Sequence, residues 1–216
     1  MNGGNGKIRV LLVDDHAVVR AGYRMLLQNS ADIEVIAEAE NGEQACRIFA
    51  EKHPDVVVMD LTMPGIGGLE AIRRIVARDP RARILVFSMH EDTVFVEQAL
   101  QAGAQGYITK SSAPEIMVEA IKEVAAGGSR LDPGIAQRLA FQKARGRDSP
   151  FSGLSTREFE IFCLLAEGLN TSEIAKRLSL SYKTVANYST QIKDKLNVST
   201  VAELTRLAIR HKVIEA

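Results

Sequence analysis

Short apolar runs in the first half of the chain end, one after another, on polar residues. Runs of Val, Ile and Leu without alternating polar positions are typical of strands buried on both faces of a parallel sheet. The polar residues that follow four such runs are Asp14, Asp15, Asp60, Ser88 and Lys110. Because ligands bind at the carboxyl ends of parallel strands, we expect these five side chains to share one cleft.

Strand and helix patterns alternate through this half of the chain, which predicts a parallel sheet with helices on both faces. The predicted strands cover residues 8–13, 33–37, 56–60, 84–87 and 106–108, and the helices lie near 18–26, 42–51, 69–78, 93–102 and 113–126. The pair Gly127-Gly128 is a helix stop. We therefore predict an α/β domain over residues 1–128, with a five-stranded, doubly wound, flavodoxin-like sheet.

The rest of the chain has no strand pattern. Residues 129–150 read as a linker with one helix, from Pro133 to about Lys143, and a flexible joint at 145–150. The pattern of residues 151–216 predicts a four-helix domain. The capping boxes Ser155–Glu158 and Asn170–Glu173 begin its first two helices. The second and third helices, joined by residues 179–181, form a helix-turn-helix pattern.

Charge divides the chain in the same way. Residues 1–128 carry 13 Lys and Arg against 18 Asp and Glu, a net −5, and residues 129–216 carry 14 against 9, a net +5. Only the C-terminal half is therefore suited to a polyanion.

Composition excludes several protein classes. The chain has 46% hydrophobic and 25% charged residues, which is typical of a globular protein. It has no apolar run near the length of a membrane span, so we expect no membrane segment. Residues 1–6 are polar and glycine-rich, unlike a signal peptide. Cys46 and Cys163 fall in different predicted domains, each within a helix, and read as small buried hydrophobes. We expect a cytoplasmic protein.

The predicted cleft has the side chains for phosphoryl chemistry. Carboxylates packed within a few ångströms need a cation, and a hard divalent ion such as Mg²⁺ prefers oxygen ligands. Asp60 is placed to act as a nucleophile that forms an acyl phosphate. Ser88 could donate a hydrogen bond to a phosphoryl oxygen, and Lys110 could offset its charge.

Over about residues 7–126 this pattern resembles the receiver domain of response regulators. The resemblance implies that a sensor histidine kinase phosphorylates Asp60. It also implies that Asp15, Asp60 and the backbone carbonyl of Thr62 bind Mg²⁺ directly, with Asp14 acting through water.

The same resemblance assigns a switch pair, Ser88 and Tyr107. In that family the aromatic ring turns inward when the hydroxyl is drawn to the phosphoryl group. The change would then spread over the fourth helix, fifth strand and fifth helix.

The third helix of the last segment, residues 181–196, is polar except for a narrow apolar stripe. Small and amide side chains suit base edges, and Lys and Tyr suit phosphates. With the flanking sequence, residues 151–213 resemble a LuxR-type DNA-binding domain, and the whole chain resembles the NarL/FixJ family of transcriptional regulators. Positions that the resemblance assigns to double-stranded DNA are Lys183, Thr184, Ala186, Asn187, Tyr188, Thr190 and Lys193.

The final helix, residues 200–211, matches the dimerisation helix of that family, which implies a homodimer on two half-sites. In family members the receiver can mask the recognition helix, and we expect the same here. Two other functions stay open. One is a phosphatase or phosphotransferase with an aspartyl-phosphate intermediate, and the other is a protein-binding adaptor without DNA binding.

Overall fold

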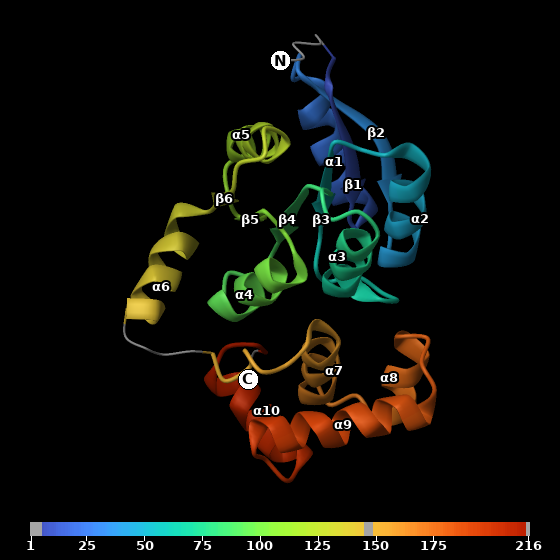
Figure 1. Ribbon diagram of the computed structural model, residues 1–216, viewed down its shortest axis with the longest axis vertical. Helices are drawn as coiled ribbons and strands as arrows, with labels where there is room; N and C mark the ends of the chain where they lie inside the picture. The colour runs from blue at the N-terminus through green and yellow to red at the C-terminus, as the bar shows by residue number, and fades with distance from the viewer. Residues whose placement is uncertain (1–5, 145–148, 215–216) are drawn as a thin grey trace.

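The computed structural model describes residues 6–144 and 149–214 (Figure 1). Its first half alternates strands and helices around one parallel sheet. The strands are β1 (Ile8–Val13), β2 (Ile33–Ala39), β3 (Val56–Met59), β4 (Ile84–Ser88), β5 (Gly106–Thr109) and β6 (Arg130–Leu131). The helices between them are α1 (Ala17–Gln28), α2 (Gly42–Lys52), α3 (Gly67–Arg78), α4 (Thr93–Ala102) and α5 (Pro114–Ala125). The α/β class and the doubly wound sheet are confirmed.

The strand order is β2-β1-β3-β4-β5-β6, and each neighbouring pair is parallel. Alternate residues of the central strands point to opposite faces of the sheet. Val57 and Met59 of β3 pack with α2, α3 and α4, whereas Val56 and Val58 pack with α1 and α5. Both faces are therefore covered, which explains why β3 and the body of β4 are wholly apolar.

The sixth strand was missed by the sequence prediction, which placed residues 129–131 in the linker. Arg130 and Leu131 extend the sheet beside Gly106 and Tyr107 of β5. A two-residue strand has no hydrophobic period, so only its pairing with β5 reveals it.

The linker helix is present as α6 (Pro133–Ala144), and the Asp132 carboxylate accepts a hydrogen bond from the Gly134 amide at its start. Residues 145–148 of the predicted joint lie outside the described residues, as do residues 1–5 and 215–216.

The C-terminal half is helical, as predicted. It contains α7 (Thr156–Ala166), α8 (Thr171–Arg177), α9 (Tyr182–Leu196) and α10 (Val201–Arg210). Both predicted capping boxes are present, and a third, formed by Thr200 and Glu203, begins α10. Ser181 caps α9 by accepting a hydrogen bond from the Thr184 amide. The Ser181 cap therefore fixes the start of α9 directly after the turn from α8.

The two halves share a hydrophobic core. Side chains of α2, α3 and α4 are continuous with those of α7, and α7 lies between the sheet half and α9 (Figure 1). Among the described residues, no helix is long and apolar enough to cross a membrane.

Candidate functional site

The polar residues that end the strands meet in one cleft. The Lys110 ammonium, just after β5, lies 2.6 Å from Oδ2 of Asp14 and 2.7 Å from Oδ2 of Asp60. The other oxygen of Asp60, Oδ1, accepts a hydrogen bond from the Leu61 amide at 2.7 Å. Three separate strand ends therefore place one ammonium between two carboxylates.

Burial makes these charges strongly interdependent. Asp14 and Asp60 are 2% and 3% exposed. Burial raises the pKa of the Asp60 carboxyl, and the Lys110 ammonium opposes this rise. Burial alone would lower the pKa of Lys110, but its hydrogen bonds to Asp14 and Asp60 outweigh that effect and raise it. Lys110 therefore stays protonated between the two carboxylates.

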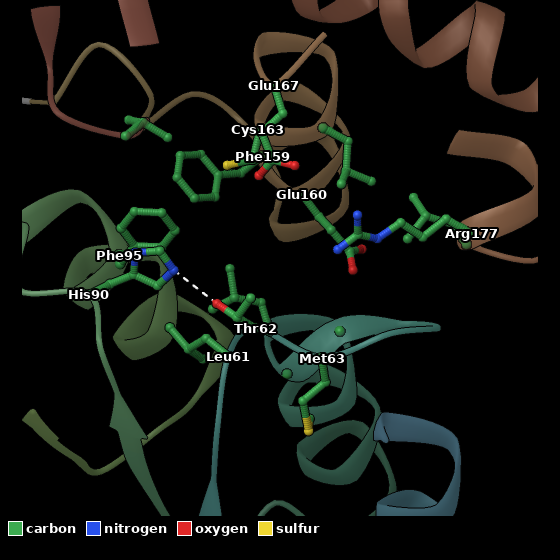
Figure 2. A pocket seen from close by; sticks show the side chains of 16 residues that line it. Leu61, Thr62, Met63, His90, Phe95, Phe159, Glu160, Cys163, Glu167 and Arg177 are labelled. Carbon is green, nitrogen blue, oxygen red and sulfur yellow. Dashed lines mark hydrogen bonds between the residues drawn. The ribbon is translucent and has the colours of Figure 1, made fainter. Parts of the chain in front are cut away.

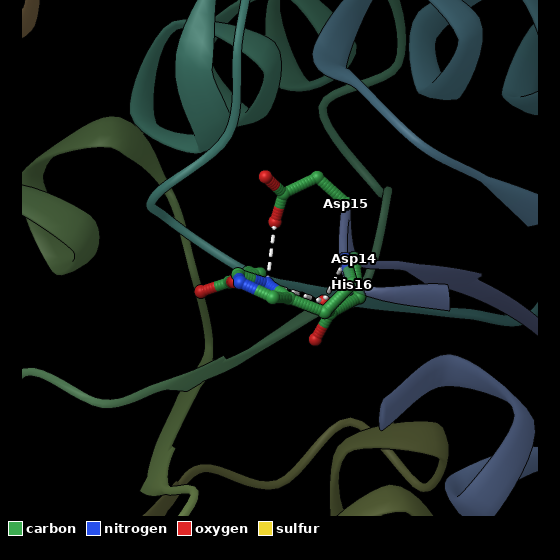
Figure 3. A group of neighbouring side chains, drawn as sticks. Asp14, Asp15 and His16 are labelled. Carbon is green, nitrogen blue, oxygen red and sulfur yellow. Dashed lines mark hydrogen bonds and ion pairs between the residues drawn. The ribbon is translucent and has the colours of Figure 1, made fainter. Parts of the chain in front are cut away.

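The cleft has the donor set for a hard divalent cation. Ligand atoms of Asp14, Asp15, His16 and Asp60 all lie within 4.8 Å of one another, and Figure 3 shows the first three on the loop after β1. Three carboxylates beside one ammonium leave two negative charges, which one divalent cation would balance. Oxygen ligands favour Mg²⁺ or a similar hard ion. His16 was not anticipated, although it directly follows the acidic pair; its Nδ1 lies 2.8 Å from Oδ1 of Asp15.

Ser88 and Tyr107 are both fully buried beside this cleft. They share one neighbour, His90, in the loop that follows β4. The Ser88 hydroxyl accepts a hydrogen bond from the His90 amide at 3.3 Å, and the Tyr107 hydroxyl donates to the His90 carbonyl at 2.7 Å. The His90 ring in turn lies 2.9 Å, Nε2 to Oγ1, from the side chain of Thr62. His90 thus links Thr62 after β3, Ser88 at the end of β4 and Tyr107 within β5, a role its sequence position did not indicate.

Helix α9 presents the side chains expected to contact DNA. Lys183, Asn187 and Thr190 are exposed, and Thr184, Ala186, Tyr188 and Lys193 are half-buried. Val185 and Ile192 face the core, so the polar residues lie on the outer side of the helix. Tyr182, the first residue of α9, is also exposed and adds an aromatic side chain to this surface.

The sequence matches two families over these same regions. The response regulator receiver domain matches residues 10–122, and the luxR family of bacterial regulatory proteins matches residues 152–208. The chain is a response regulator of the NarL/FixJ family. It is 41% identical over 211 residues to response regulator GacA of Pseudomonas aeruginosa, covering 97% of this chain and 99% of GacA. It is also 41% identical to response regulator UvrY of Escherichia coli, covering 97% of each chain.

Solved structures agree with this assignment. A LuxR-family response regulator from Aurantimonas is 47% identical, with a TM-score of 0.63, over 64% of this chain and 99% of that one. RcsB of Salmonella enterica, bound to promoter DNA with a phosphomimetic, is 25% identical, with a TM-score of 0.70, over 94% of this chain and 98% of that one. This response regulator therefore combines a receiver with a LuxR-type DNA-binding domain.

The two domains of this response regulator meet mainly at α7. The Phe95 ring of α4 stacks on His90, with centroids 3.8 Å apart, and meets Phe159 of α7 edge to face. Figure 2 shows these rings beside a cavity of about 130 Å³ between the domains. The Gln98 side chain also donates a hydrogen bond to the Phe151 carbonyl. His90 therefore lies between the acidic cleft and the domain contact.

A carboxyl group lies inside this contact. Glu160 of α7 reaches toward the start of α3, where a Cβ atom at Gly67 would collide with its Oε1. Burial raises the pKa of Glu160 to about 7, with a further rise from Glu70 and an opposing effect from its partner Arg157.

The receiver contact leaves three of the α9 positions that are expected to contact DNA uncovered. Lys183, Asn187 and Thr190 are exposed in this arrangement. Tyr188 is one of the four half-buried positions, and its phenol adds to the effect of Glu70 in raising the pKa of Arg73 on α3. In this arrangement the receiver does not cover Lys183, Asn187 or Thr190, so masking of the whole recognition helix is not seen.

Proposed function

We propose that Asp60 accepts a phosphoryl group from a sensor histidine kinase in a Mg²⁺-dependent reaction, and that this controls DNA binding by a homodimer. The observation that carries the proposal is the position of Lys110, within 2.7 Å of both Asp14 and Asp60 in a nearly buried cleft. A surface ion pair would not need three strand ends to assemble it. Lys110 is placed to stay beside the phosphoryl group once Asp60 has become an acyl phosphate.

The transfer needs one bond to form and one to break. A carboxylate oxygen of Asp60 attacks phosphorus while the P–N bond of the phosphohistidine breaks, and the electron pair leaves with the imidazole. Asp15, Asp60 and the Thr62 carbonyl would hold Mg²⁺, with Asp14 acting through water. When bound, the ion would offset the negative charge of the incoming phosphoryl oxygens.

Lys110 and Ser88 would bind the transferred group. Lys110 exchanges its hydrogen bond with the Asp60 carboxylate for one with a phosphoryl oxygen. Ser88, whose hydroxyl accepts a hydrogen bond from the His90 amide, rotates to donate to another phosphoryl oxygen. The Ser88 rotation would release His90.

The test is intact mass spectrometry after incubation with a small acyl-phosphate donor and Mg²⁺. We expect one phosphoryl adduct on the wild type and on Asp79→Asn, a control at the far end of α3. Asp60→Asn should carry none. Stoichiometric labelling without continued release of phosphate distinguishes a phosphoacceptor from a turnover phosphatase. An adduct that persists in Asp60→Asn would contradict the assignment.

The kinase is expected to dock on an apolar groove beside the cleft. Val18 and Met25 of α1 are 86% and 68% exposed, which is unusual for large apolar side chains. The groove runs from α1, past Met89 of the β4–α4 loop, to Lys110. A partner seated there would bring its phosphohistidine to Asp60.

Docking and chemistry can be separated with one substitution. Val18→Glu should reduce labelling by a phosphorylated kinase that labels the wild type, and leave labelling by the small donor unchanged. Val201→Glu, at a second exposed apolar position on α10, serves as the control. Equal loss with both donors would mean that the change damages the cleft itself.

The signal would reach the DNA-binding domain through His90. Drawing Ser88 toward the phosphoryl group removes the acceptor of the His90 amide and moves the loop on which Phe95 stacks. This weakens the contact between Phe95 and Phe159 and frees α7. The freed domain then pairs with a second copy through α10 and places α9 in the major groove.

A further inference from the structure

Arg20 of α1 is a nearly buried cation whose guanidinium group holds together the elements beside the cleft. It is 8% exposed, and a buried charge is tolerated only when it is paired and hydrogen-bonded. Its Nη1 donates to the backbone carbonyl of Asp14 at 2.6 Å. Nε donates to Glu38 at 3.0 Å and Nη2 to Glu40 at 3.1 Å, both at the carboxyl end of β2.

The carbonyl that Arg20 holds belongs to the peptide between Asp14 and Asp15. This one peptide plane orients both acidic side chains of the β1 loop. The Asp14 amide donates to the Ala39 carbonyl at 3.1 Å, and the His16 amide donates to Oδ1 of Asp14 at 2.8 Å. The hydrogen bond from Arg20 to the Asp14 carbonyl is a third contact that holds this loop. Arg20 makes no hydrogen bond to a carboxylate oxygen of the cleft.

We propose that Arg20 is a positioning residue for the divalent-cation site, acting through the Asp14–Asp15 peptide. The inference rests on the proposed function, which places Mg²⁺ in this cleft. Groups that hydrogen-bond to metal ligands without contacting the metal commonly contribute roughly 10–100-fold to metal affinity. Arg20 would act in this way on a backbone carbonyl, so that both carboxylates keep their direction when the ion binds.

Electrostatics and positioning make opposite predictions here. A guanidinium group beside the cleft repels a divalent cation, so removing its charge should tighten Mg²⁺ binding if charge alone mattered. If Arg20 holds the peptide, its removal weakens binding despite the lost repulsion. Weaker Mg²⁺ binding on removal of Arg20 therefore indicates positioning, and tighter binding indicates charge repulsion alone.

Arg24 provides a matched control on the same helix. Its Nη1 donates to the other oxygen of Glu38 at 3.0 Å, but its side chain is 51% exposed and no hydrogen bond joins it to Asp14. Arg24→Ala removes the same single positive charge and one partner of Glu38. It leaves the Asp14–Asp15 peptide supported.

The experiment is a Mg²⁺ titration of the full chain by isothermal calorimetry, with thermal unfolding as a check on folding. We expect Arg20→Ala to weaken Mg²⁺ binding by about tenfold or more, and Arg24→Ala to leave it near the wild-type value. Arg20→Lys keeps the charge but cannot span three partners, so it should also weaken binding. If Arg20→Ala does not fold, Arg20→Lys decides the question.

Unchanged or tighter binding in the folded Arg20 variants would overturn the inference and leave the proposed function intact. Failure of the wild type to bind Mg²⁺ would instead refute the metal site itself. As a second readout, the Mg²⁺ concentration that gives half-maximal labelling by the acyl-phosphate donor should rise in Arg20→Lys. Its labelling rate at saturating Mg²⁺ should stay near that of the wild type.

Discussion

Phe95 of α4 and Phe159 of α7 meet edge to face, with ring centroids 5.5 Å apart, and join the core of the receiver to that of the DNA-binding domain. Phe159 is also packed against Phe151 and Phe162 within its own domain. Phe95 contacts His90 on the other side, in the loop that touches Ser88 and Tyr107. Through His90 and Phe95, this aromatic contact therefore connects the phosphoacceptor cleft with the DNA-binding domain.

Phe95→Ala should loosen the domains without phosphorylation. Burying a Phe side chain contributes ~1.5–3 kcal/mol, so the balance between closed and open arrangements should shift about tenfold or more. Hydrogen–deuterium exchange should show faster exchange in α7, and DNA affinity of the unphosphorylated protein should rise. Leu100→Ala, an exposed position on α4, is the control. Unaltered exchange in α7 of Phe95→Ala would mean that this contact does not hold the domains together.

Glu160 should make the domain contact depend on pH. Burial raises its pKa to about 7 in the closed arrangement, whereas an exposed Glu titrates near ~4.3. Closure therefore binds a proton. The contribution of Glu160 to closure is complete below the pKa of the exposed carboxyl and is lost as the pH rises through about 7. Small-angle X-ray scattering should show the particle expanding as the pH rises through this value.

The charged groups facing Glu160 come from two helices: Arg157 on α7, and Glu70 and Arg74 on α3. His90 lines the same cavity, and burial lowers its pKa, so its protonation at low pH would favour opening. The comparison is therefore made above about pH 6.5, the ordinary value for His. Glu160→Gln should flatten the pH dependence, and Glu167→Gln, at the exposed end of α7, should keep it. Retention of the full dependence in Glu160→Gln would rule out this carboxyl as its source.

Two glycines should respond to alanine in opposite directions. A Cβ atom at Gly68 would overlap the backbone carbonyl oxygen of Asp60, whereas one at Gly22 would meet nothing within 4 Å. Gly68→Ala must displace α3 from the phosphoacceptor loop, and we expect a loss of ~1–3 kcal/mol of folding free energy, with slower labelling of Asp60. Gly22→Ala, inside α1, should gain ~0.5–1 kcal/mol because alanine favours the helix. Urea unfolding measures both, and equal effects would show that α3 can shift freely.

The cleft could be predicted from the sequence because its geometry follows from strand periodicity. Continuous apolar runs fix which strands are buried, and the residues that end them must meet at one edge of the sheet. Asp14, Asp60 and Lys110 therefore lie where the sequence placed them.

Contacts made by packing between distant segments could not be predicted in this way. In the sequence, Arg20 is only one charged residue of an amphipathic helix. Its partners Glu38 and Glu40 become its neighbours only when β2 packs beside α1. Phe95 reads as a core residue of its own helix, and nothing in its neighbourhood of the sequence indicates Phe159. Strand β6 exists only through its pairing with β5.

Lys183 and Asn187 should affect DNA binding in different ways, although both are exposed on α9. A lysine that contacts phosphate contributes the same free energy on every sequence, through release of counterions. Lys183→Ala should therefore weaken binding to all DNAs and reduce the salt slope by about one unit. Lys52→Ala, an exposed lysine on the receiver, should leave both unchanged.

Asn187 has an amide that can pair with the edge of an adenine. Asn187→Ala should cost ~1–3 kcal/mol on a selected site and little on random DNA, with the salt slope unchanged. Fluorescence anisotropy over a range of salt concentrations, on a selected site and on random DNA, measures all three variants. If Asn187→Ala weakened both DNAs equally and lowered the salt slope, α9 would contact only the backbone there. Specificity would then have to come from other residues of α9, among which Thr190 is exposed.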